Sequence, residues 1–75
     1  MANNAFMRKL VVDELMDTLF FATGEIVKKE RAAKAYILTT PVIQIEVESH
    51  RKIKFNGNVY QRVYQVKDAI GRMVL

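Results

Sequence analysis

The stretch Phe55-Asn56-Gly57-Asn58 carries the strongest local signal in this chain of 75 residues. An Asn-Gly pair between two strand-like runs favours a two-residue type I′ turn, because both central residues must tolerate a positive φ. We therefore expect a β-hairpin with Asn56 and Gly57 as its loop.

Counting outward from this turn gives a register that separates apolar from charged side chains. The expected cross-strand partners are Ile53 with Tyr60, Arg51 with Arg62, Ser49 with Tyr64 and Val47 with Val66. A shift of one residue would turn the apolar set outward, so the turn and the burial pattern agree. Arg51 opposite Arg62 is a destabilising pair of like charges. Three explanations remain open: ion pairs with helical acids, a hairpin tip that projects into solvent with its aromatic residues, or a bulge that changes the register.

The strand pattern extends upstream to Pro41, the single proline of the chain. Apolar and polar residues alternate over residues 43–48, as in a half-buried strand. Pro41 disfavours a helical conformation at the preceding residue, so any helix must end before it. Residues 68–71 resemble a second turn, which would leave 72–75 as a short third strand.

The residues before Pro41 favour a helix. Asn3 or Asn4 is a suitable N-cap, and residues 5–22 contain neither glycine nor proline. Beyond Gly24, the sequence places Glu25 and Glu30 each four residues before a lysine, the favourable order for helical ion pairs. We therefore expect one α+β domain over residues 1–75. An N-terminal helix over about 4–36, long or broken near Gly24 into two, packs on a three-stranded antiparallel meander over about 42–75.

The residue inventory argues against catalysis and against a metal site. The chain has no cysteine and one histidine, so it offers no thiolate ligands and no multi-histidine site. Ser49 and His50 are neighbours that point to opposite faces of a strand, so they do not form a nucleophile and base. Asp13 and Asp17 share a helix face and define the enzymatic alternative, in which Glu14 joins them. We expect no catalytic residue, no metal and no cofactor.

The N-terminal sequence and the charge-free stretches bear on location. The first ten residues lack the basic-then-apolar order of a secretory signal. The longest charge-free stretch near the start is shorter than a membrane span requires. We therefore expect a cytoplasmic protein that does not use a membrane.

Two clusters of basic residues account for the formal net charge of +4. A basic excess favours polyanionic partners through steering and counterion release. We therefore expect a small regulatory protein that binds DNA or RNA, with aromatic side chains beside the cations as stacking surfaces. The candidate nucleic-acid-binding residues are Lys28, Lys29, Arg31, Lys34, Arg51, Lys52, Lys54, Tyr60, Arg62 and Tyr64.

The N-terminal half has more apolar side chains than three strands can cover. A second copy of the chain, packed about a two-fold axis, would shield them from water. The alternative is a helix pair, broken at Gly24, that covers itself. The expected interface residues are Phe6, Leu10, Met16, Leu19, Phe20 and Phe21. The same face supports a second hypothesis for function, a regulator or inhibitor that binds another protein.

Overall fold

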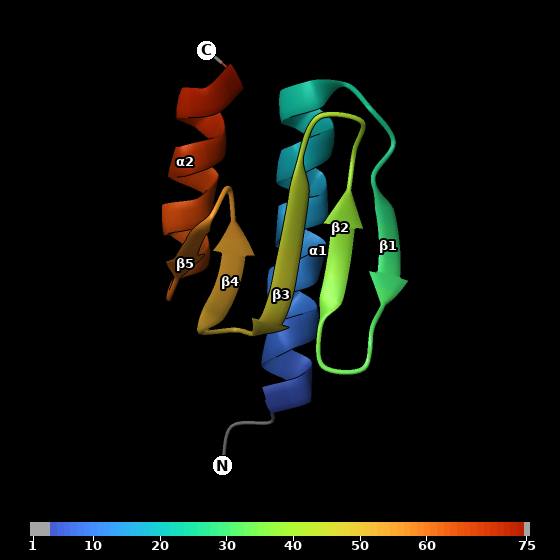
Figure 1. Ribbon diagram of the computed structural model, residues 1–75, viewed down its shortest axis with the longest axis vertical. Coiled ribbons are helices and arrows are strands. Elements are labelled where there is room, and N and C mark those ends of the chain that lie inside the picture. The colour runs from blue at the N-terminus through green and yellow to red at the C-terminus, as the bar shows by residue number, and fades with distance from the viewer. Residues whose placement is uncertain (1–3, 75) are drawn as a thin grey trace.

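The computed structural model describes residues 4–74 and consists of a five-stranded antiparallel sheet with both helices on one face (Figure 1). The strands follow one another in the sheet in the order in which they occur in the chain. The long first helix lies behind the middle of the sheet, and the second helix lies beside it behind the last two strands. The elements are α1 (Asn4–Thr23), β1 (Lys28–Arg31), β2 (Tyr36–Thr39), β3 (Gln44–Ser49), β4 (Lys52–Phe55), β5 (Asn58–Tyr60) and α2 (Val63–Val74).

The expected Asn-Gly hairpin is confirmed in β4 and β5. Asn56 and Gly57 have φ angles of 53° and 81°, both positive as a type I′ turn requires. Ile53 pairs with Tyr60 across this turn, which is the register that the sequence predicts. The half-buried strand upstream is confirmed as well, since Ile45 and the other apolar residues of 43–47 are buried.

The expectation of a three-stranded meander behind one N-terminal helical half is wrong, because residues 28–39 form the hairpin of β1 and β2. Gly24 ends α1 in the left-handed conformation, with φ 71° and its N–H donating to Phe20 O at 2.8 Å. The expected helical ion pairs beyond it are worth only about 0.2–0.5 kcal/mol each. Pairing of β2 with β3 instead buries Leu38 completely. That burial is worth roughly 1.5–3 kcal/mol, so these residues are more stable as a strand than as a helix.

The expected third strand is also wrong, because residues 63–74 form α2. Val66 and Ile70 lie four residues apart on one helix face and are fully buried, so this segment follows the helical period. The Gln65 side chain accepts hydrogen bonds from the N–H groups of Gln61 and Arg62, both at 3.2 Å, and so caps the helix. Val47 therefore pairs with Ile53 and not with Val66.

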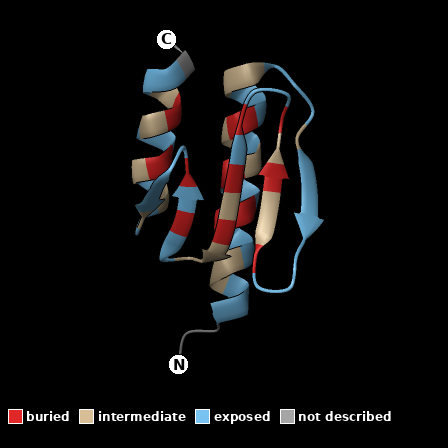
Figure 2. Ribbon diagram, in the orientation of Figure 1, coloured by how far each residue is buried: buried red, intermediate tan, exposed pale blue. Residues whose placement is uncertain are grey.

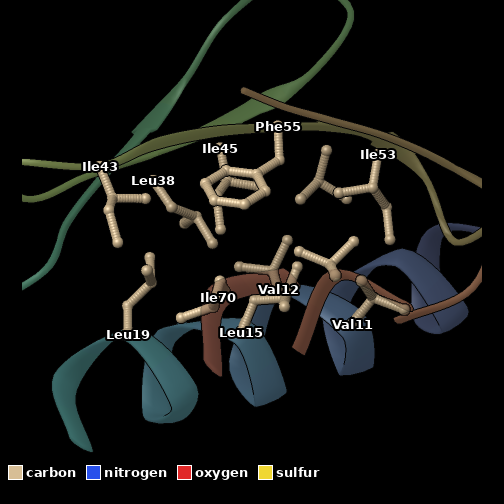
Figure 3. Packing of buried hydrophobic residues seen from close by; sticks show 12 residues of the cluster. Val11, Val12, Leu15, Leu19, Leu38, Ile43, Ile45, Ile53, Phe55 and Ile70 are labelled. Atoms are coloured by element: carbon tan, nitrogen blue, oxygen red, sulfur yellow. The ribbon is translucent and has the colours of Figure 1, made fainter. Parts of the chain in front are cut away.

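The core lies between the inner face of the sheet and the two helices (Figure 2). Leu15 and Leu19, one helical turn apart on α1, point at the side chains of the sheet (Figure 3). Phe55 from β4 lies opposite them on the sheet side, and Ile70 from α2 lies beside them on the helix side. The buried apolar side chains of this core cluster are Val11, Val12, Leu15, Leu19, Leu38, Ile43, Ile45, Val47, Ile53, Phe55, Val66 and Ile70.

Two glycines allow a matched test of backbone strain. An alanine at Gly57, where φ is 81°, would be held in the left-handed region, so we expect Gly57→Ala to destabilise the fold by about 1–2 kcal/mol. Gly71 lies in α2 with no atom within 4 Å of an added Cβ. We expect Gly71→Ala to stabilise the fold by up to about 1 kcal/mol. Urea denaturation of both variants measures the difference, and a stabilising Gly57→Ala would contradict the turn geometry.

Candidate functional site

Several segments that carry basic residues lie toward one end of the molecule, the lower end in Figure 1. Antiparallel strands turn at alternate ends, so the β1–β2 loop, the β3–β4 turn and the β5–α2 loop lie toward the same end. Both helices begin toward that end as well. We call this region the basic end, and its seven cationic residues are Arg8, Lys9, Arg31, Lys34, Arg51, Lys52 and Arg62.

The electrostatics of the basic end are favourable for an anion. All seven residues are exposed except Arg8, which is half-buried. Seven of the twelve lysines and arginines of the chain belong to this end, and one of them, Lys52, is offset by its ion pair with Glu48. Neither α1 nor α2 has an acidic residue in its first turn, so the positive ends of both helix dipoles add to the field.

The ring of Tyr36 holds two of the guanidinium groups. Arg8 from α1 and Arg31 from β1 lie 5.0 Å and 5.6 Å from the ring centroid, within the range of cation–π attraction. Arg8 Nη1 also donates to Glu48 O at 3.4 Å, and Arg31 Nη1 donates to Tyr36 Oη at 3.5 Å. Both cations are therefore positioned before any ligand arrives, which lowers the entropy lost on binding.

A hollow of about 240 Å³ lies beside the start of α1. Arg8, Ser49 and Glu48 contribute to its wall. Within residues 4–74, Arg8 Nε and His50 Nδ1 are buried and have no hydrogen-bond partner. Arg8 therefore retains a donor that its contacts inside the fold do not use.

Two of the candidate lysines take part in ion pairs on the outer face of the sheet. Glu48 contacts Lys52 Nζ at 3.1 Å and Lys54 Nζ at 3.2 Å, and Lys54 also lies 3.8 Å from Glu46. The hydrogen bond from Lys52, followed by that from Lys54, lowers the pKa of Glu48, and Glu48 in turn raises the pKa of Lys54. The positive charge of Lys54 is therefore neutralised by two carboxylates. Lys54 also lies further along β4 from the basic end than Lys52 does.

The expectation that Arg51 and Arg62 face each other as cross-strand partners is wrong. Arg51 lies in the β3–β4 turn, where its N–H donates to Ser49 Oγ at 3.2 Å, and Arg62 lies in the β5–α2 loop. A bulge between Val47 and Ser49 changes the register just before the turn. The two arginines thus share the basic end without facing each other across a ladder.

The aromatic candidates divide between the core and the surface. Phe55 is 4% exposed, so a projecting platform built on it is wrong. Tyr60 packs against Phe55 with ring centroids 6.4 Å apart, whereas Tyr64 in the first turn of α2 is 60% exposed. Tyr64 is therefore the candidate aromatic residue that remains available to a ligand.

The remaining basic and acidic candidates lie elsewhere. Lys28 and Lys29 begin β1, so they lie at the far end of that strand from Arg31. Glu14 pairs with Lys67 of α2 at 3.6 Å and not with an arginine of the hairpin. Among the described residues, no group of three or more His, Asp or Glu side chains is placed to hold a metal ion.

The candidate interface residues differ in how far they are buried. Phe6, Leu10, Phe20 and Phe21 are exposed and Met16 is half-buried, but Leu19 is fully buried in the core. Leu19 is therefore a packing residue. Within residues 4–74, no helix has the length and apolar character that crossing a membrane requires.

Arg8 and Lys9 are the residues of the basic end that the sequence did not indicate. They stand apart from both basic clusters, next to apolar helix positions. Only the topology, which starts α1 beside the β3–β4 turn, brings Arg8 to within 3.4 Å of Glu48 O.

Fold and site together define an α+β protein with a helix, a five-stranded antiparallel meander, a second helix and a basic end. Comparison of the chain with models of protein families, with curated proteins and with solved structures finds no match.

Proposed function

We propose that this protein binds nucleic acid through the basic end, with its cationic side chains on the phosphate backbone. The observation that carries the proposal is that segments with basic residues, namely the start of α1, the end of β1, the start of β4 and the loops and turn beside them, lie toward one end of the fold. Neutralising phosphates releases condensed counterions, which is the main source of affinity for proteins that bind without regard to sequence.

The shape of the basic end favours contact with the backbone over contact with base edges. The molecule is about 21 × 20 Å in cross-section, so its end covers about six base pairs of a duplex at 3.4 Å per step. Loops and helix N-termini contact phosphates and fix the register of a protein on its ligand, without reading sequence. Tyr64, exposed beside these cations, offers a stacking surface to an unpaired base.

The experiment that tests the proposal maps the contact surface in solution. Backbone amide shifts of the ¹⁵N-labelled protein are followed as a duplex DNA of about 12 base pairs, or a single strand of equal length, is added at low ionic strength. We expect the shifts to concentrate at residues 8–9, 31–34, 50–52 and 61–62. Residues 24–26 and 40–42, at the other end of the molecule, should be unaffected.

A polyglutamate of similar charge is the control ligand. Weaker binding of polyglutamate supports recognition of phosphates, because arginine forms bidentate contacts with phosphate groups in a fixed geometry. Shifts concentrated away from the basic end, or no shifts with either nucleic acid, would contradict the proposal.

A further inference from the structure

The end of the molecule opposite the basic end is apolar. The last turn of α1, the α1–β1 loop and the β2–β3 loop lie together there, at the top of Figure 1. Phe21 and Ile26 are 82% and 83% exposed, and Val42 in the β2–β3 loop is 71% exposed. Together with Phe20 these residues form what we call the apolar end.

Ile26 stands between two hollows on this surface. One hollow, of about 380 Å³, has walls from Glu25, Lys28 and Pro41, and the other, of about 300 Å³, has walls from Asp17 and Phe20. A protruding side chain next to hollows on the same patch is what a two-fold interface needs, because each copy supplies both the projection and the recess.

The charges around the hollows also suit a second copy. Asp17 and Glu25 are acidic, whereas Lys28 on the first hollow is basic. A two-fold arrangement that seats Ile26 of each copy in a hollow of the other brings the acidic and basic residues that line the hollows to the rim of the contact. Opposite charges at the rim of an apolar contact favour this partner and fix its orientation.

We propose that two copies of the chain associate through their apolar ends, so that the dimer carries one basic end at each extremity and joins two segments of nucleic acid. The bridging of two nucleic-acid segments rests on the proposed function, whereas the association of the two copies does not. The long axis of the molecule is 38 Å, and the two ends lie at its opposite extremities. End-to-end association therefore separates the basic ends by much more than the width of one contact site.

The size of the apolar end sets the expected strength. A cross-section of 21 × 20 Å offers roughly 400 Å² per copy, about half of the 800 Å² that a standard interface buries on each partner. A contact of this size belongs to the weak, transient interfaces, so we expect dimers to form only at micromolar concentrations or above.

Sedimentation equilibrium between about 1 and 200 µM tests the association. We expect the wild type to pass from monomer to dimer over this range, and Ile26→Asp to remain monomeric because it would bury an unpaired charge. Val59→Asp is the matched control, since Val59 is 58% exposed on β5 and remote from the apolar end, and it should dimerise as the wild type does. A wild type that stays monomeric at the highest concentration would overturn the proposal.

A bridging assay tests the arrangement of the two basic ends. One duplex carries a donor fluorophore and a second carries an acceptor, and both are mixed with protein above the dissociation constant of the dimer. We expect energy transfer with the wild type and its loss with Ile26→Asp, which should still bind a single labelled duplex. A dimer that binds duplex without energy transfer would overturn the end-to-end arrangement. A dimer that binds no duplex would overturn the proposed function and leave the association standing.

Discussion

Replacing Leu15 by alanine is expected to remove most of the stability of the fold. Leu15 is fully buried on α1 and faces the inner side of the sheet. Leucine-to-alanine changes at such sites cost about 3–5 kcal/mol, because lost burial and an unfilled cavity add together. A chain of 75 residues has a total stability of about 4–11 kcal/mol, so a large part of it disappears.

Leu10→Ala is the control for this experiment, because it makes the same change on the same helix. Leu10 is 47% exposed on the side of α1 away from the sheet, so its loss should cost less than about 1 kcal/mol. Urea denaturation followed by circular dichroism measures both variants. Equal destabilisation by the two changes would contradict the packing of α1 on the sheet.

Removing two cations of the basic end is expected to weaken binding of duplex DNA on the order of 50-fold at about 0.1 M salt. Each phosphate contact contributes about 0.9 to the dependence of log affinity on log salt, so two lost contacts amount to nearly two decades. Arg31 and Arg51 are exposed, in β1 and in the β3–β4 turn, so Arg31→Ala with Arg51→Ala should leave the fold intact. Fluorescence anisotropy of a labelled duplex measures the change.

The double variant Lys28→Ala with Arg72→Ala separates position from net charge. It also removes two positive charges, but from the start of β1 and the last turn of α2, which lie toward the opposite end of the molecule. We expect its affinity to fall less than about threefold, since only the long-range field changes. An equal loss in both double variants would show that binding follows net charge and has no defined surface.

The elements that the sequence predicts correctly are those with a strong local cause. Asn56 and Gly57 adopt positive φ angles at low cost, so the turn needs little help from the rest of the fold. Ile45 and Val47 belong to an alternating pattern that matches a sheet with one covered face. In both places local preference and tertiary burial agree.

The elements that the sequence misses are those where local preference is weak or opposed. Lys28–Arg31 has a helical composition, yet it forms an edge strand whose charges protect an open sheet edge. Residues 63–66 fit a strand as well as a helix, and only the buried faces of Val66 and Ile70 against α1 and the sheet decide between them. Tertiary packing determines both segments.

The basic end is predictable only in part for the same reason. Sequence clustering identifies Arg31, Lys34, Arg51 and Lys52, because charge density along the chain is visible. Arg62 is a candidate only through an expected pairing with Arg51 that does not occur. It does not identify Arg8 and Lys9, since the position of α1 relative to the turns is a property of the topology.

The dependence of the association constant on salt, measured for the wild type and both double variants, tests most directly the claim that the basic end contacts phosphates. With up to seven cations in contact, the slope of log affinity against log salt should lie between about −3 and −6 for duplex DNA. Loss of Arg31 and Arg51 should make the slope shallower by about 2, while loss of Lys28 and Arg72 should leave it unchanged. A wild-type slope near zero, or the same slope after loss of Arg31 and Arg51, would contradict the account.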